Sequence, residues 1–371
     1  MDILRCESDV RFTPKSGHVQ CTRSCLLWAN SGHRRLLSGP RALTGWPSIP
    51  PAESGWRPTS PLRKAQIEMT EPDLDHRDLL LLGILSVLWG GSFFFVGIAV
   101  KELPASTIVF ARVSIAASLL LLICGFFHIK FPWSASHWIS FFVMGLLNNV
   151  LPFLLTTLGQ KQISSGLASI INATTPLFTV AITVAFREEQ LVARKVLGIL
   201  VGLAGVAILH SRGEDFLVGR SNGIALCLGA ALSYGFAGLW GRRRLTGIPP
   251  MTSATCQLMC SSVVMAFLAG LTDPPWQLHM PGAATWIALF GLAALSTALA
   301  YILFFRILLR SGATNVMLVT LLIPLTAILL GHIFLGESID AREIIGALVI
   351  ASALVIIDGR AFRWIFLQMT M

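Results

Sequence analysis

The sequence predicts an all-α polytopic membrane protein with ten transmembrane helices arranged as two inverted five-helix repeats. Three observations lead to this prediction. Hydrophobic residues make up 54% of the 371-residue chain, only 13% are charged, and the mean hydropathy is +0.72, whereas a soluble domain carries about 25% charged residues. The apolar residues come in runs of about 20, the length that spans a hydrocarbon core of about 30 Å. One long stretch of the sequence also occurs twice.

The duplicated stretch runs from Ser164 to His210 and contains an apolar run, a short charged turn and a second apolar run. Apolar runs match each other easily by chance, so the weight rests on polar residues, proline and glycine. A shift of 148 residues without a gap places Pro176 on Pro324, Glu189 on Glu337, Arg194 on Arg342 and Gly198 on Gly346. We interpret this as an internal repeat, with a first copy over residues 69–212 and a second over residues 213–371, including a short cytoplasmic tail.

Ten apolar runs of helical length follow one another closely after residue 78. The predicted helices cover residues 79–100, 105–126, 136–158, 164–186, 194–210, 223–241, 252–271, 284–305, 313–335 and 342–358. Ten helices divide into two sets of five.

Residues 1–68 are rich in Arg, Ser, Pro and Trp and lack a continuous apolar segment. This composition is typical of a disordered tail, and it also fits upstream sequence translated from a wrongly chosen start, with Met69 as the natural beginning. An organellar targeting peptide is a third interpretation.

The distribution of Lys and Arg in the short loops predicts the orientation. With the N-terminus in the cytoplasm, the inner side holds most of these residues, including Arg242–Arg244. The outer side then holds Lys101, Lys161, Arg212, Arg220 and Arg342. We therefore expect a multi-pass protein of the cytoplasmic (inner) membrane with both termini inside. Because five is odd, the second repeat enters from the opposite face, so the turns at Glu189 and Glu337 should lie on opposite sides.

The chain resembles the EamA family of the drug/metabolite transporter superfamily over nearly all of residues 79–358. The resemblance rests on motifs in a fixed order: Trp89-Gly90-Gly91-Ser92, Pro104 with Arg112, Ala168-Ser169 before Pro176-Leu177-Phe178, Glu188-Glu189, the Gly198, Gly202 and Gly205 ladder, Tyr234, Pro324, Gly336-Glu337 and Gly346. It implies ten helices, two antiparallel halves, a central cavity and export of small metabolites, amino acids or drugs. One departure is that Arg112 meets Leu258 when Pro104 is set on Pro250, so any role of this arginine is confined to one half.

Arg112 is the first candidate for function. It lies eight residues after Pro104, about 12 Å along a helix, and a charge near the membrane centre should face the bundle interior or a water-filled cavity. It could attract a substrate carboxylate or control a gate. The alternatives are snorkelling to the headgroups or a structural bond to helix-end carbonyls.

Other candidates are polar or aromatic residues at membrane depth and prolines that interrupt helices. They can line a cavity or serve in gating, or they can bond and pack between helices as ordinary structural residues. These candidates are Trp89, Ser92, Asn148, Asn149, Asn172, Pro176, Tyr234, Tyr301, Pro324 and His332.

The duplicated turns carry residues for which a structural role is the first expectation. Glu189 and Glu337 precede the fifth and tenth helices, where a carboxylate caps the following helix and complements its dipole; gating is the alternative. Arg194 and Arg342 are expected to anchor to headgroups or to pair with these glutamates.

These observations predict a secondary transporter that exports small organic metabolites by alternating access. We expect a small-molecule substrate and the lipid bilayer as partners and no nucleic acid; a proton as coupling ion and the oligomeric state stay open. No Walker loop, HExxH, CxxC or GxSxG stands in a suitable context, so no catalytic residue, cofactor or metal is expected. The alternatives are a non-transporting membrane scaffold or receptor, and an intramembrane enzyme.

Overall fold

The computed structural model describes residues 76–210, 218–274 and 278–358. These residues belong to one compact unit, Gln66–Met371. The predicted tail over residues 1–68, the border between the repeats at 212/213 and the C-terminal tail lie outside the described residues. Within them, all regular secondary structure is helical.

The helices follow the predicted apolar runs, and each of the ten predicted ranges overlaps helical structure. The bounds are α3 His76–Ala99, α4 Ala105–Phe126, α5 Ala135–Gly145, the π-helical segment η2 Leu146–Val150, α6 Leu151–Gln160, α7 Ser165–Asn172, α8 Thr175–Ala185, α9 Ala193–His210, α10 Val218–Arg244, α11 Pro250–Thr272, α12 Ala283–Ala293, the π-helical segment η4 Ala294–Leu299, α13 Ala300–Met317, α14 Val319–Leu335 and α15 Ala341–Asp358.

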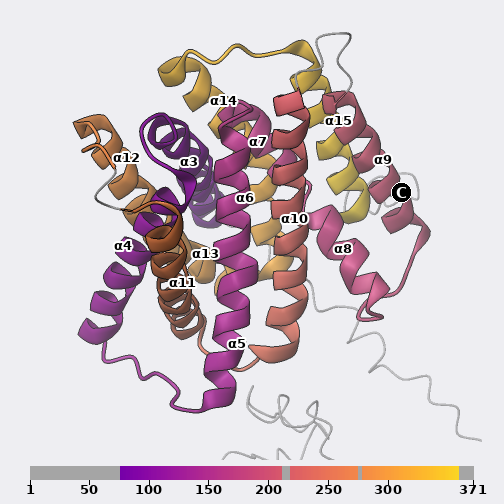
Figure 1. Ribbon diagram of the computed structural model, residues 1–371. Helices are drawn as coiled ribbons and strands as arrows, with labels where there is room; N and C mark the ends of the chain where they lie inside the picture. Colours follow the sequence, from indigo (N-terminus) through magenta and orange to yellow (C-terminus); the bar gives the residue numbers. More distant parts are fainter. Residues whose placement is uncertain (1–75, 211–217, 275–277, 359–371) are drawn as a thin grey trace, which may run out of the picture. The chain divides into compact units, whose positions relative to one another are not determined.

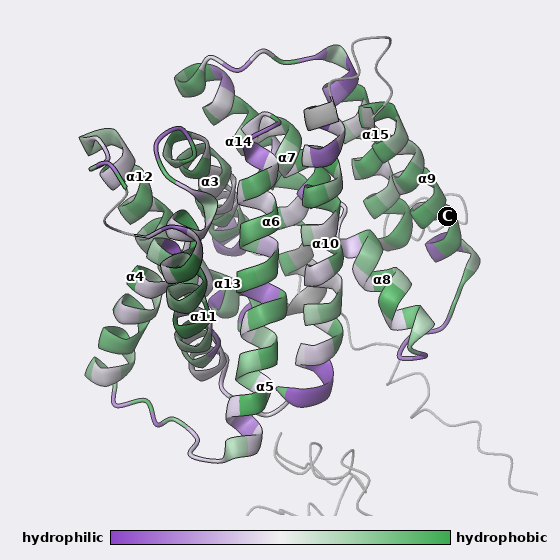
Figure 2. Ribbon diagram, viewed as in Figure 1, coloured by the Kyte–Doolittle hydropathy of each residue, from purple (hydrophilic) through white to green (hydrophobic). Residues whose placement is uncertain are grey.

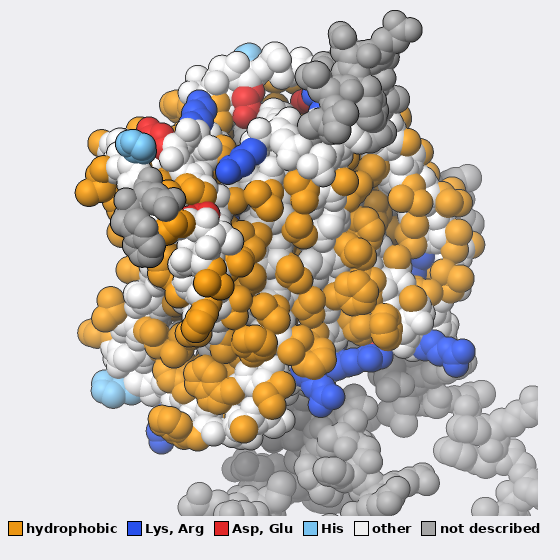
Figure 3. Space-filling model, in the orientation of Figure 1, with side chains coloured by type: hydrophobic (Ala, Val, Ile, Leu, Met, Phe, Trp, Pro, Cys, Tyr) orange, Lys and Arg blue, Asp and Glu red, His pale blue; other side chains and the backbone are white. Residues whose placement is uncertain are grey.

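Seven helical spans in the described part of the chain are long and apolar enough to cross a membrane, and Val319–Leu335 is a shorter apolar helix. The helices are hydrophobic along most of their length (Figure 2). On the visible face of the molecule, hydrophobic side chains cover the middle, while charged side chains gather towards the helix ends (Figure 3). An apolar exterior bounded by charged ends is what a bilayer requires, so this is a multi-pass membrane protein.

The interruption expected at Asn172 and Pro176 is present, and one predicted loop is absent. The predicted helix over 164–186 is divided at residues 173–174, because Pro176 lacks the N–H that would continue the ladder, and the Thr175 hydroxyl donates to the Asn172 carbonyl at 2.7 Å. The predicted loop between residues 305 and 313 is wrong: α13 continues to Met317, and only residue 318 separates it from α14.

The most extensive helix pairs join one helix from the first half of the chain with one from the second: α9 with α15, α3 with α14, α4 with α11 and α6 with α10. In Figure 1, α9 and α15 lie side by side at one edge of the bundle. Their backbones approach closely at two glycines. A Cβ on Gly205 would lie 3.2 Å from the Gly346 carbonyl, and one on Gly346 would lie 3.3 Å from the Gly205 carbonyl. Small residues at such crossings allow the backbones of membrane helices to approach closely.

The duplication of the sequence has a counterpart in the bounds of the helices. α5 and α12 begin and end 148 residues apart, as do α9 and α15, and the segments η2 and η4 begin 148 residues apart. The internal repeat therefore extends to the two π-helical segments, a rare form of helix that is often found at functional sites.

Candidate functional site

Arg112 on α4 is buried, with 9% of its surface exposed. Its Nε atom donates a hydrogen bond to Thr297 Oγ1 at 2.9 Å, and its guanidinium lies 3.5 Å from the centre of the Phe153 ring. Thr297 belongs to η4 and Phe153 to α6. The side chain therefore points into the bundle and does not snorkel to the headgroups.

A network of hydrogen bonds surrounds η2. Asn149 is fully buried; its Oδ1 accepts from the Tyr301 hydroxyl at 2.8 Å, and its Nδ2 donates to Ser261 Oγ at 3.1 Å. Asn148 Nδ2 donates to the Tyr301 hydroxyl at 3.1 Å and to Gln257 Oε1 at 3.2 Å. These bonds join η2, α11 and α13 at one place.

Pro152, just after η2, leaves a backbone carbonyl of this segment without a helical donor. In a π-helix the residue five positions earlier supplies the acceptor, which for Pro152 is the Leu147 carbonyl. Proline has no N–H to donate, and the Ser233 hydroxyl of α10 donates to this carbonyl instead, at 2.7 Å. The Leu147 carbonyl thus accepts a hydrogen bond that joins η2 to α10.

The two π-helical segments exchange contacts between the repeats. Asn149 of η2 bonds to α11, and Thr297 of η4 bonds to α4. Asn149 and Thr297 are 148 residues apart, and so are Phe153, under the guanidinium, and Tyr301, in the amide network. Equivalent positions of the two repeats therefore meet around Arg112 and the asparagines.

A row of aromatic rings connects this network to α3. Trp89 lies 5.4 Å from Phe304, Phe304 lies 5.1 Å from Phe305, and Phe305 lies 6.1 Å from Tyr301, between ring centres. Tyr234 and Tyr301 are close enough to Arg112 to interact with its charge. Aromatic rings and neutral polar groups thus surround the buried cation.

The turn at Glu337 holds the start of a helix that is distant in sequence. Its carboxylate accepts from the Ser165 N–H at 2.8 Å, the Ser165 hydroxyl at 2.8 Å and the Gly166 N–H at 3.3 Å. These groups are the N-terminus of α7, whose N–H groups have no partner within the helix. Glu337 was expected to cap the next helix, α15, whereas the structure places it on α7.

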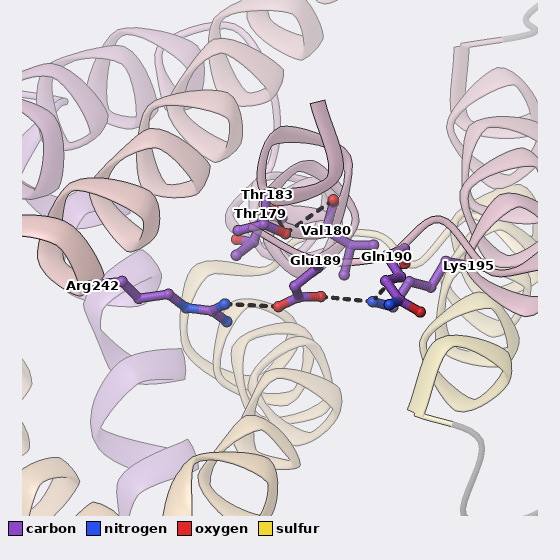
Figure 4. Close-up of polar contacts among 7 residues, drawn as sticks. All are labelled: Thr179, Val180, Thr183, Glu189, Gln190, Lys195 and Arg242. Carbon is purple, nitrogen blue, oxygen red and sulfur yellow. Dashed lines mark hydrogen bonds and ion pairs between the residues drawn. The ribbon is translucent and has the colours of Figure 1, made fainter. Parts of the chain in front are cut away.

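The turn at Glu189 makes ion pairs (Figure 4). One carboxylate oxygen lies 2.7 Å from Arg242 Nη1 and the other 2.7 Å from Lys195 Nζ. The hydrogen bond from Lys195 is the main reason that the pKa of Glu189 lies below its ordinary value, and Arg242 also lowers it. Glu188 pairs with Arg243 at 2.7 Å, so this turn is tied to the end of α10.

Comparison with known proteins identifies the family. A sequence model of the EamA-like transporter family matches residues 78–211 and, a second time, residues 221–358. The chain belongs to the EamA-like transporter family. The double match agrees with the internal repeat of the sequence.

Relatives of this EamA-like chain are named as transporters. It is 30% identical to the uncharacterized inner membrane transporter YedA of Escherichia coli over 282 residues, covering 74% of this chain and 88% of YedA. It is 26% identical to the uncharacterized transporter YoaV of Bacillus subtilis over 275 residues, covering 73% of this chain and 94% of YoaV. A solved crystal structure has the same fold, with a TM-score of 0.56 and 17% identity, covering 76% of this chain and 97% of that one.

The residues predicted for this EamA-like site fall into two groups. Arg112, Asn148, Asn149, Tyr234 and Tyr301 meet around the π-helical segments, with Trp89 joined to them through the aromatic row. The others are elsewhere. The Ser92 hydroxyl donates to the Trp89 carbonyl of its own helix at 2.6 Å. Asn172 and Pro176 lie at the break between α7 and α8, and Pro324 lies buried inside α14. The exposed His332 places Nδ1 2.9 Å from the Glu337 carbonyl. Arg194 and Arg342 are exposed.

Four residues of the network were not predicted: Phe153, Gln257, Ser261 and Thr297. The duplication carried a signal for Thr297, since it occupies the position of Asn149 in the second repeat. Across the described residues there is no group of three or more His, Cys, Asp or Glu side chains that could hold a metal ion.

Proposed function

We propose that this chain is a secondary transporter of the cytoplasmic membrane that exports small organic metabolites by alternating access. In this proposal ten helices form two inverted five-helix repeats, residues 69–212 and 213–371, with both termini in the cytoplasm. Transporters built from inverted repeats bind their substrate near the middle of the membrane, where the repeats meet.

The contacts of the duplicated turns support the inverted arrangement. The helical span that contains α7 and α8 begins at Ser165 and ends at Ala185. Glu337 binds its first residues, whereas Glu189 follows its last turn and pairs with the end of α10. Equivalent residues of the two repeats therefore lie at opposite ends of one membrane-length span, as a two-fold axis in the membrane plane requires.

The observation that carries the functional proposal is the burial of Arg112 where the repeats exchange contacts. A charge inside the membrane costs at least about 2.5–3.5 kcal/mol on insertion scales, and such residues mark substrate pathways. Arg112 is held by a π-helical segment, a form associated with functional sites. Binding and gating are roles that would justify this cost.

The experiment has two steps. An export screen first identifies a substrate, by overexpressing the protein and scoring resistance to toxic amino-acid analogues. Flux of that compound is then measured in proteoliposomes with the wild-type protein and Arg112→Ala, with and without a proton gradient. We expect flux in the wild type and none in Arg112→Ala. Arg306→Ala, an exposed arginine on α13, is the matched control and should retain flux.

Two results would contradict the proposal. Wild-type flux no faster than that of empty liposomes would remove the transport function. Full flux by a well-folded Arg112→Ala protein would remove Arg112 from the pathway while leaving transport in place. The comparison with and without a proton gradient tests whether transport is coupled to protons. It is needed because the described helices carry Asp or Glu, the usual proton carriers, only in their first or last turns.

A further inference from the structure

Among the residues that the structure describes, the contacts of Arg112 contain no negative charge. Its described partners are the hydroxyl of Thr297 and the face of the Phe153 ring, and the groups that interact with its charge are the phenols of Tyr234 and Tyr301. Phenols are neutral near pH 7. The ion pairs found among the described residues involve other arginines and lysines.

Acidic residues are also distant from this depth of the membrane. Within the described helices, Asp and Glu are confined to the first turns of α3 and α15 and the last residue of α15. The acidic residues of the described turns lie between spans, where they bind helix starts or arginines. Over the described length of the spans, the interior therefore has positive charge without a resident counter-charge.

A buried charge is normally paired, because the loss of hydration is otherwise uncompensated. The guanidinium has five N–H donors in a planar fork that matches a carboxylate with two parallel hydrogen bonds. Among the described residues, Thr297 accepts from the Nε donor of Arg112, and the ion pairs of Asp and Glu side chains involve other cations. The chemistry that completes this site is an anion with two oxygen acceptors.

We propose that the transported solute is a small organic anion whose carboxylate, or an anionic group of similar geometry, binds the guanidinium of Arg112. This inference rests on the proposed transport function and narrows its substrate class. A cationic solute would meet only like charge at this depth, so the site discriminates against amines that lack an acidic group. The anion supplies the counter-charge during transport.

The test uses a thiol reporter and needs no knowledge of the natural solute. Ser296 precedes Thr297 in η4, is buried, and its hydroxyl has no hydrogen-bond partner among the described residues. Its hydroxyl lies 3.9 Å from the place of a Cβ on Gly91 of α3, so Ser296→Cys places a thiol of similar size in the bundle interior, one residue from the Arg112 contact. The purified full-length protein is treated with a methanethiosulfonate reagent carrying either a sulfonate or a trimethylammonium group. Modification at position 296 is followed by mass spectrometry, which separates it from the native cysteines.

We expect the sulfonate reagent to react about tenfold faster than the trimethylammonium reagent, since a cationic site concentrates anions. Adding Arg112→Gln should bring the two rates together, and Arg112→Lys should keep part of the preference. Arg306→Gln, on the exposed surface of α13, should leave it unchanged. Benzoate should slow the sulfonate reaction more than benzamide does, because only benzoate carries the carboxylate.

Several outcomes would overturn the inference. These are equal rates for the two reagents, a preference that persists in Arg112→Gln, and a thiol that neither reagent reaches. Chloride that slows labelling as strongly as benzoate would assign the site to a resident inorganic ion instead of a solute. The assay needs no flux, so loss of the transport function would leave its result standing. Flux of a cation that is intact in Arg112→Gln would reject the anion while preserving transport.

Discussion

The buried arginine and the buried asparagines differ in what their removal leaves behind. Arg112 donates to Thr297, whose hydroxyl also donates to the Leu292 carbonyl at 2.9 Å. Its loss therefore leaves no buried charge and no isolated hydroxyl. Asn149 both accepts from Tyr301 and donates to Ser261, so its loss leaves a half-buried phenol without an acceptor.

Replacement of these two residues by apolar ones should therefore have opposite consequences for stability. Arg112→Met should keep or raise the thermal unfolding temperature, because exchange of a buried charge for an apolar side chain is often neutral or stabilising. Asn149→Leu should destabilise the protein by about 1–3 kcal/mol, the cost of an unsatisfied buried polar group. Thermal unfolding in lipid nanodiscs measures both. A temperature for Arg112→Met as low as that for Asn149→Leu would show that the arginine has a structural partner.

The sequence was informative about those site residues whose polarity is unusual for an apolar helix. Arg112, Asn148 and Asn149 stand out in this way, and the structure brings them to one place. Thr297 and Ser261 do not, because a hydroxyl in a helix is commonly satisfied by its own backbone, as Ser92 is. A partner on another helix depends on packing, which periodicity does not contain.

At the scale of elements, the start of α7 and the end of α14 depend on close approach at Gly331. A Cβ at this position would lie 2.5 Å from Glu337 Oε2 and 2.6 Å from Ser165 Oγ. The first repeat has Thr183 at the equivalent position, and its Glu189 makes ion pairs instead. Gly331 therefore leaves the space in which the Glu337 turn binds the N-terminus of α7.

Gly331→Ala should separate Glu337 from α7 and destabilise the protein by about 1–3 kcal/mol, the usual cost of overpacking. Gly83→Ala is the matched control, because nothing lies within 4 Å of its added Cβ and alanine is the better helix former by about 0.5–1 kcal/mol. It should be neutral or stabilising. Equal thermal unfolding temperatures for the two variants would contradict the close approach.

The ion pairs of Glu189 should make the α8–α9 turn sensitive to acid. The pKa of Glu189 is lowered in the folded protein, first by the hydrogen bond from Lys195. A lowered pKa contributes stability that is fully present above the ordinary value of about 4.5 and is lost as the pH falls through the lowered value. The protection of residues 186–192 from hydrogen exchange, corrected for the intrinsic rate at each pH, should therefore fall below about pH 4.5, and Glu189→Gln should remove this dependence. Exchange in Glu189→Gln that follows the wild-type pH profile would assign the effect to another group.

The helix bounds could be predicted from the sequence where the length of an apolar run or the position of a proline determines them. The helix ranges came from apolar runs, and Asn172 with Pro176 indicated the break between α7 and α8. The continuation of α13 to Met317 and the π-helical segments did not follow from the same pattern. In η2 the Leu147 carbonyl accepts from the Ser233 hydroxyl of α10, a partner that the local sequence does not show.

On the scale of the whole molecule, the repeats would be symmetric in topology and asymmetric in charge. The turn at Glu189 meets Arg242 and Lys195, and the turn at Glu337 meets backbone N–H groups. An ion pair at the surface is screened by salt, whereas a capped helix start is less affected. Alternating access through these two ends would therefore respond to ionic strength mainly at the Glu189 end.

The proposed inversion predicts opposite membrane locations for the two turns. Truncated chains are fused after residue 192 or after residue 340 to alkaline phosphatase, which is active outside the cytoplasm, or to green fluorescent protein, which fluoresces inside it. We expect fluorescence at 192 and phosphatase activity at 340, since the Glu189 turn lies beside the basic residues Arg242 and Arg243 and such residues favour the cytoplasmic side. Glu189 and Glu337 lie at opposite ends of the Ser165–Ala185 span. The chain between them must therefore cross the membrane an odd number of times, which places the two turns on opposite sides. The same reporter active at both positions would exclude an inverted pair.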